Sequence, residues 1–185
     1  LVERVSEMPF EQFLQERLFK PLGMEDTRFH APDTSRLASV YEVGGALHEA
    51  AATSDFRKEG GLASGGGGLI STAGDYLKFC KMLLNHGTFD GQQLLQNTSI
   101  EAMTKTQLSP GVPYAQGRGF GLGVEVHLQA EGAAAHRGQY GWNGIASTHF
   151  WISPEDDLVV IALSQRWPFS TELKDLLAPI VYNAI

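Results

Sequence analysis

The chain has 185 residues, of which 43% are hydrophobic and 19% charged, so it is long enough to bury a core as one domain or part of one. Its formal net charge is −7 and neither Lys nor Arg is clustered, which argues against a nucleic-acid or anionic-membrane partner. No apolar run reaches about 18 residues, so we expect no membrane span. Neutral or cationic small substrates fit this charge better.

The first predicted elements are two short helices. Apolar residues at positions 1, 2 and 5 have the spacing of a helix face, yet no initiator Met, signal peptide or cap residue precedes them. We therefore expect the chain to open inside a helix of a longer precursor. The second helix should begin at Pro9 and end at Lys20, because Pro21 disfavours helical geometry in the residue before it.

Residues 25–68 show no sustained periodicity, which predicts a long irregular excursion over the surface. The stretch ends in four glycines at 65–68. A Gly-rich turn ahead of a helix can bind phosphate, but no Gly-Lys-Ser/Thr follows and the chain is acidic. The glycines are therefore interpreted as conformational, not as a phosphate-binding loop.

A helix is predicted from Ala73 to about Asn85. Thr72 and Asp75 have the spacing of a capping box at its start. Cys80, the only cysteine of the chain, lies inside this helix. It can form no internal disulfide, and we expect it to have a packing role.

The second half of the chain changes to a strand period of two. We predict a short helix, three strands and a last helix, at 98–103, 120–128, 143–152, 158–163 and from Ser170 or Thr171 onward. Short connections make the strands antiparallel. The third strand is apolar at every position, which predicts that both its faces are covered and that it lies near the middle of its sheet. The apolar face of the last helix comprises Leu173, Leu176, Leu177, Ile180 and Val181.

These elements predict an α/β fold of the α+β kind. Helices and long loops occupy residues 1–115, and antiparallel strands with the final helix occupy residues 116–185. Three adjacent carboxylates at 155–157 are interpreted as a solvated turn between strands. We therefore expect no metal ion and no cofactor.

Three segments carry a resemblance to a known family. Residues 19–24 (Phe-Lys-Pro-Leu-Gly-Met) follow one helix, residues 66–75 (Gly-Gly-Gly-Leu-Ile-Ser-Thr-Ala-Gly-Asp) precede another, and residues 120–123 (Phe-Gly-Leu-Gly) lead to the Trp142 segment. In this order and spacing the chain resembles the serine β-lactamase-related hydrolases. The resemblance covers residues 1–185 and implies a β-lactamase/transpeptidase-like fold, with this chain as the carboxyl-terminal portion of one such domain.

The resemblance also implies where catalysis takes place. Family members use a Ser-x-x-Lys pair, a Tyr-x-Asn or Ser-x-Asn element, and a third motif on a sheet strand. These 185 residues contain no Ser-x-x-Lys, so we expect the nucleophile Ser and its Lys in a missing N-terminal segment of the same protein. Residues 141–144 (Gly-Trp-Asn-Gly) resemble the Gly-Trp-Gly-Gly third motif of the esterase-like branch, with Asn143 in place of a glycine.

By resemblance, the third motif assigns the site residues of this chain. The Ile145 N–H would be one oxyanion donor, Gly144 would let substrate approach the strand, and Trp142 would line the pocket. His136 starts a His-x-Gly alternative whose imidazole could exchange protons near neutral pH, and Tyr140 is a further possible site residue. On residue type alone, Trp142 could instead be a packed aromatic at a turn.

The function implied by the resemblance is hydrolysis of a small-molecule ester or amide through a covalent acyl-enzyme. A carboxylesterase is favoured over a β-lactamase, because Trp142 replaces the cationic Lys that would engage a β-lactam carboxylate. The chain alone should be inactive, with the N-terminal segment as its partner. The alternative is a non-catalytic β-lactamase-like binding or scaffold protein. The compartment stays open, with the cytoplasm favoured over the periplasm.

Overall fold

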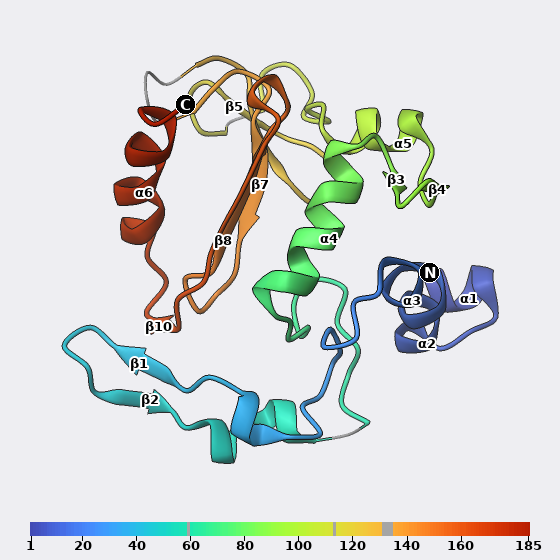
Figure 1. The fold of residues 1–185 in the computed structure, drawn as a ribbon, viewed down its shortest axis with the longest axis vertical. Helices are drawn as coiled ribbons and strands as arrows, with labels where there is room; N and C mark the ends of the chain where they lie inside the picture. The colour runs from blue at the N-terminus through green and yellow to red at the C-terminus, as the bar shows by residue number, and fades with distance from the viewer. Residues whose placement is uncertain (59, 113, 131–134) are drawn as a thin grey trace.

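The computed structural model describes residues 1–58, 60–112, 114–130 and 135–185. Its centre is a five-stranded antiparallel sheet of order β5-β6-β7-β8-β9. The five strands are Arg118–Phe120, Glu125–His127, Tyr140–Asn143, His149–Ser153 and Leu158–Ala162. Helix α6 (Glu172–Tyr182) covers one face of the sheet and α4 (Ala73–Leu84) lies against the other (Figure 1). The expected α/β fold, an antiparallel sheet flanked by helices, is therefore confirmed.

The other elements surround this centre. The N-terminal helical stretch consists of α1 (Val2–Ser6), α2 (Phe10–Leu14), the π-helical turn η1 (Gln15–Phe19) and α3 (Lys20–Leu22). A small second sheet contains β1 (Val40–Glu42), β2 (Leu47–Glu49) and β10 (Arg166–Trp167). The hairpin of β3 (Thr88–Phe89) and β4 (Gln92–Gln93) precedes α5 (Asn97–Met103). Short 3-10 turns lie at Thr34–Arg36, Ala51–Thr53, Asp55–Arg57 and Pro154–Asp156. Within the described ranges, no helix is long and apolar enough to cross a bilayer.

The core has two parts, one on each face of the main sheet. Strand β8 divides its side chains between them, with Phe150 and Ile152 facing α4 and Trp151 facing α6. Burying an apolar side chain of this size stabilises the fold by about 1.5–3 kcal/mol. This burial on both sides holds the sheet in a fixed orientation between the two helices.

Strand β9 contributes to both parts of the core and lies at the edge of the five-stranded sheet. Ile161 packs toward α4 and Val160 toward α6, so the expected burial of both faces is confirmed. Among the described residues, β9 pairs only with β8. Its expected central position needs a second neighbouring strand and stays a prediction. An apolar residue at every position of a strand indicates that both faces of the strand are covered. Helices can provide this cover, so it does not require a neighbouring strand on each side.

The sheet has five strands where the sequence predicted three, because two predicted strands extend across turns. The run 120–128 reverses between β5 and β6, where the Gly121 N–H donates to the Val124 carbonyl at 2.8 Å and Gly123 has a φ of 90°. The predicted strand 143–152 overlaps β7 only at Asn143, and it joins that residue to β8 across a turn at 144–148. Apolar alternation continues through the β5–β6 turn, so periodicity did not show that reversal, whereas residues 144–148 do not alternate and were included in the predicted strand by mistake.

The sequence predicted an irregular excursion at 25–68, but part of this segment has regular structure. It contains the β1–β2 hairpin, whose turn holds Gly44 and Gly45 with φ angles of 94° and 89°. Strand β1 also pairs in parallel with β10, more than a hundred positions later in the chain. The strands are three residues each, too short for a convincing period, and the parallel partner is far away in sequence.

The N-terminal helical stretch runs beyond its predicted end. It continues through Pro21 to Leu22 and stops at Gly23, whose φ of 65° is the left-handed value of a helix C-cap. The preceding turn η1 is π-helical, so the chain is wider there and the proline ring is accommodated. The predicted stop at Lys20 is therefore wrong by two residues.

Helices α4, α5 and α6 match their predicted positions, with changes in detail. The Thr72 hydroxyl caps α4 by accepting from the Asp75 N–H at 3.2 Å, as expected. Helix α5 begins at Asn97, one residue before its predicted start. In α6 the buried residues are Ala178 and Tyr182, whereas Leu176 and Ile180 of the predicted apolar face are exposed.

Candidate active site

Strand β7 becomes an open edge at the predicted third motif. Its pairing with β6 ends at the Glu125–Gly141 pair, whereas its pairing with β8 continues to Asn143. The Gly144 N–H donates to the Thr148 carbonyl at 2.8 Å, so it points toward β8. The next N–H, that of Ile145, lies at the start of the turn at 144–148, beyond the last residue of β7. It has no hydrogen-bond partner among the described residues.

The two glycines of the motif are required by close contacts. A Cβ on Gly141 would lie 2.2 Å from the Phe150 carbonyl oxygen, which is backbone of the neighbouring strand. A Cβ on Gly144 would lie 2.2 Å from the Thr148 Oγ1. A side chain at position 141 would force β7 and β8 apart, whereas one at position 144 would require the Thr148 side chain to move.

Trp142 lies at the surface beside this edge. Its side chain is 43% exposed, and its ring meets Phe120 edge-on with centroids 5.0 Å apart. Phe120 in turn meets Tyr114 at 6.1 Å, and the Tyr114 hydroxyl donates to Glu125 at 3.2 Å. Trp142 is therefore part of an exposed aromatic row and is not enclosed in the core. The sequence did not predict this row, because Tyr114, Phe120 and Trp142 come from three separate segments of the chain.

Asn143, the departure from the glycine form, points away from the Trp142 side. Tyr140 and Trp142 share the α4-facing side of β7, so the alternation along the strand places Asn143 on the α6-facing side. There its Oδ1 lies 2.7 Å from the Nδ1 of His149, which is 2% exposed. Burial lowers the pKa of His149, and Lys174 adds to this effect. A neutral His149 with the proton on Nδ1 therefore donates to the Asn143 amide oxygen.

The two further candidates are not brought to this place. His136 Nδ1 lies 2.7 Å from Asp156, which follows the end of β8, whereas the turn at 144–148 precedes the start of β8. Tyr140 is 3% exposed in the core, and burial raises its pKa. The structure thus places residues 142–145 together at the end of β7, whereas His136 and Tyr140 lie elsewhere. In the ranges that the structure describes, no cluster of His, Cys, Asp or Glu could hold a metal ion.

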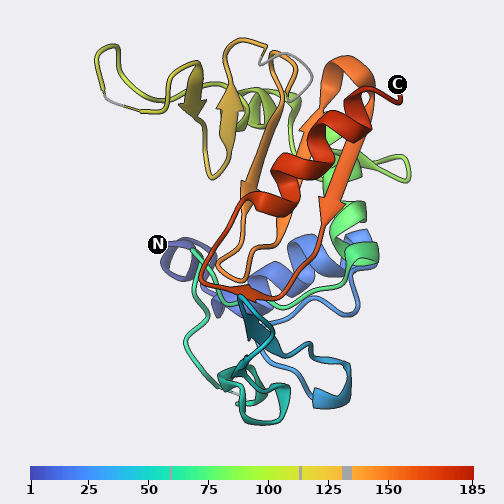
Figure 2. The same cartoon turned by 90° about the vertical axis from the view of Figure 1, so that its left-hand side faces the viewer.

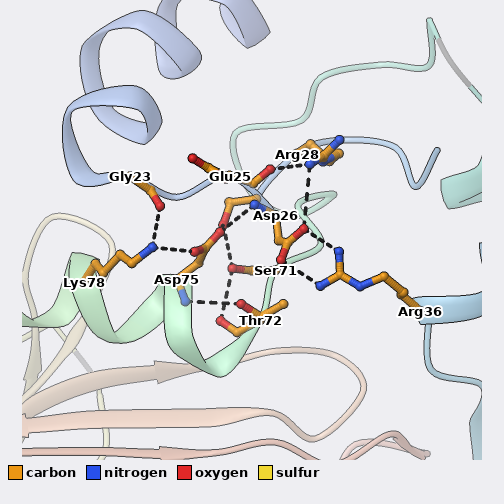
Figure 3. Close-up of polar contacts among 10 residues, drawn as sticks. Gly23, Glu25, Asp26, Arg28, Arg36, Ser71, Thr72, Asp75 and Lys78 are labelled. Carbon is orange, nitrogen blue, oxygen red and sulfur yellow. Dashed lines mark hydrogen bonds and ion pairs between the residues drawn. The ribbon is translucent and has the colours of Figure 1, made fainter. Parts of the chain in front are cut away.

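A second polar cluster lies at the start of α4 (Figure 3). The Asp75 carboxylate accepts from the Asp26 N–H at 2.8 Å, the Thr27 hydroxyl at 3.2 Å and the Lys78 Nζ at 3.0 Å. Asp26 is held in turn by two nitrogens of Arg36, at 2.6 and 2.7 Å. The Asp75 side chain therefore binds a loop that is distant in sequence. In a full capping box it would instead accept from the backbone N–H of Thr72. We interpret this cluster as a structural joint, because its charged groups are engaged with one another.

Comparison with known proteins decides the family. A sequence model of the Beta-lactamase family matches residues 1–181. The chain belongs to the β-lactamase family. The resemblance inferred from three short segments is thus confirmed. The chain is 32% identical to protein Rv1367c of Mycobacterium tuberculosis over 91% of its own length and 46% of that protein. It is 28% identical to monacolin J acid methylbutanoyltransferase of Aspergillus terreus, over 92% of this chain and 47% of that one.

Solved structures of the β-lactamase family share the fold. A LovD6 mutant of simvastatin synthase from Aspergillus terreus matches with a TM-score of 0.83 and 27% identity, over 99% of this chain and 53% of that one. EstCE1, described as a hydrolase with promiscuous acyltransferase activity, also gives a TM-score of 0.83, at 24% identity over 98% and 52% of the two chains. The chain spans about half the length of the curated relatives that it matches.

Proposed function

We propose that this chain supplies the sheet side of the active site of a serine hydrolase that cleaves small esters or amides through an acyl-enzyme. The observation that supports this most directly is the open edge of β7. There, in a β-lactamase-family chain, an unpaired Ile145 N–H lies next to the exposed Trp142. The proposal includes the assignment of residues 1–185 to the carboxyl-terminal portion of one domain, with the nucleophile Ser and its Lys in another part of the protein.

The chemistry needs a rigid donor at this point. Attack on an ester carbonyl creates an oxyanion, which is stabilised by preorganised N–H groups at about 2.7–3.1 Å. Ile145 would supply one donor and the nucleophile's own N–H the other. Gly144 carries no side chain that could block the approach of substrate. Trp142 can donate from its indole nitrogen but cannot act as a base, so proton transfer is left to the Ser and Lys of the nucleophile motif.

Ester or acyl-transfer chemistry is favoured over β-lactam hydrolysis. The position that a cationic Lys would occupy holds Trp142, and its neighbours Phe120 and Tyr114 are aromatic. An aromatic row offers no charge to a substrate carboxylate. A relative at 28% identity is described as a methylbutanoyltransferase, which also transfers an acyl group.

The test uses the full-length protein with two chromogenic substrates, a short-chain ester and a cephalosporin. We expect ester turnover to exceed cephalosporin turnover. Trp142→Ala should lower kcat/KM for the ester by about tenfold, since it removes a wall that contacts the substrate. Leu176→Ala, on the exposed side of α6, is the control and should leave kcat/KM unchanged.

Two results would count against the proposal. One is full-length protein that turns over neither substrate, which would favour a non-catalytic scaffold. The other is burst hydrolysis by the isolated 185 residues, because it would place the nucleophile inside a sequence without Ser-x-x-Lys. An unchanged rate in Trp142→Ala would remove Trp142 alone from the site.

A further inference from the structure

The turn at 144–148 is held from outside the main sheet by one serine. Ser147 is buried, and its φ of 62° is unusual for a residue other than glycine. Its hydroxyl donates to the Arg166 carbonyl at 3.1 Å and accepts from the Ser170 N–H at 3.0 Å. Its own carbonyl accepts from the Ser164 hydroxyl at 2.5 Å. One side chain thus fastens the turn to the segment 164–170.

The backbone next to Ser147 adds to this attachment. The Arg166 N–H donates to the Ala146 carbonyl at 3.0 Å, and the Ser147 N–H closes the turn on the Gly144 carbonyl at 3.0 Å. A non-glycine residue in the left-handed region costs about 1–3 kcal/mol and persists only where its surroundings fix it. These bonds provide such surroundings, and Ile145 lies between the fixed positions 144 and 146.

The attachment extends to the β1–β2 hairpin. Strand β10 lies within the segment 164–170 and pairs in parallel with β1, and the Tyr41 N–H donates to the Gln165 carbonyl at 2.9 Å. His48 of β2 stacks on Trp167 with centroids 5.0 Å apart and planes 14° apart. Figure 2 shows β10 directly above the hairpin, at the end of the main sheet. Residues from the first third of the chain therefore reach the turn through β10.

We propose that Ser147 is a positioning residue for the oxyanion turn, and that the β1–β2 hairpin steadies this turn through β10. This inference rests on the proposed function, because it assigns the turn a catalytic purpose. Ile145 is 70% exposed, so its own side chain does little to fix the direction of its N–H. The preorganisation that oxyanion stabilisation requires then comes from the contacts of Ser147.

The experiment compares three serine variants of the full-length protein. Ser147→Gly removes the hydroxyl but suits the observed φ, so it should fold even if Ser147→Ala does not. Ser153→Ala is the matched control, because Ser153 is equally buried but lies at the opposite end of β8, where it binds Asp156. Amide hydrogen exchange at 144–148 and steady-state kinetics with the chromogenic ester are measured for each.

We expect Ser147→Gly to speed exchange at 144–148 by about tenfold and to lower kcat by about tenfold, with KM within about twofold. Ser153→Ala should change neither quantity at this turn. Wild-type exchange at 144–148 in Ser147→Gly would overturn the proposal, and so would a rise in KM with an unchanged kcat. Faster exchange in Ser147→Gly, together with no ester turnover by the wild-type protein, would support the attachment of the turn through Ser147 but refute the proposed function.

A second pair of variants tests the hairpin. Tyr41→Pro removes the N–H that binds Gln165, whereas Tyr41→Ala keeps it. We expect Tyr41→Pro to speed exchange at 144–148 by about threefold and Tyr41→Ala to leave it unchanged. Equal exchange in the two variants would overturn the role of the hairpin.

Discussion

Asn143 and His149 form a side-chain pair beneath the candidate site. The pair joins β7 to β8 on the α6-facing side, so the extra side chain of Asn143 does not narrow the space beside Trp142. His149 is nearly inaccessible, and an imidazolium in that position would lose its hydration. The accommodation of Asn143 therefore depends on a neutral His149.

This dependence predicts a pH effect on stability. Burial holds the folded-state pKa of His149 below its ordinary value of 6.5, with Lys174 adding to the shift and Ser170 and Asp175 opposing it. As the pH falls below about 6.5, the unfolded chain takes up a proton that folded His149 resists, so the free energy of unfolding decreases. We expect stability to fall between pH 7.5 and 5, measured by denaturant unfolding at each pH.

The matched variants are His149→Gln and His48→Gln. His149→Gln removes the group that titrates and should flatten this pH dependence. His48 is accessible on the β2 strand, and its replacement should leave the dependence as it is. The same pH dependence in His149→Gln and wild type would show that His149 is not its source.

At the residue scale, the sequence located the motif but not its contacts. Gly141, Trp142 and Gly144 are neighbours in the chain, so their pattern is visible without coordinates. The Asn143–His149 pair depends on the register of the hairpin, and the Ser147 contacts depend on a segment about twenty residues away. His136 was a candidate by residue type, and its contact with Asp156 places it at the end of β8 opposite the turn at 144–148.

At the element scale, Asp75 joins α4 to the loop at 26–27, which follows the N-terminal helices. This side chain is 8% exposed and accepts three hydrogen bonds, two of them from the loop at 26–27. Asp75→Asn keeps the size but loses the charge that these donors face. We expect it to lower the free energy of unfolding by about 1–3 kcal/mol in denaturant titrations.

The control for Asp75 is another Asp with a Lys three residues later. Asp55 pairs with Lys58 at 2.6 Å, but its side chain is 90% exposed. Asp55→Asn should leave the unfolding midpoint unchanged, because water solvates both partners. Equal effects of the two substitutions would mean that Asp75 is not a structural joint.

Elements with strong local signals were predicted well. Helix α4 has a cap, an apolar face and a left-handed stop at His86 and Gly87, all close in sequence. The hairpin β5–β6 was predicted as one strand, because alternating side chains continue through its glycine turn. Most of β7 was missed, because the strand predicted there began at Asn143. The β1–β10 pairing was missed, since a parallel contact between distant segments leaves no local pattern.

At the scale of the whole molecule, the candidate site lies where three parts of the fold meet. The main sheet supplies the open edge of β7, α4 and α6 hold this sheet between them, and β10 ties its end to the β1–β2 hairpin (Figure 1). The chain covers about half the length of its curated relatives. We propose that the reacting serine faces this edge from the part that these residues do not include.

The most direct test removes the proposed N–H donor. Ile145→Pro lacks the backbone N–H, and Ile145→Ala retains it while losing most of the side chain. In full-length protein with the chromogenic ester, Ile145→Pro should lower kcat by about 10²–10³-fold, whereas Ile145→Ala should stay within about threefold of wild type. A wild-type kcat in Ile145→Pro would contradict the account, because the open edge of β7 would then play no part in stabilising the oxyanion.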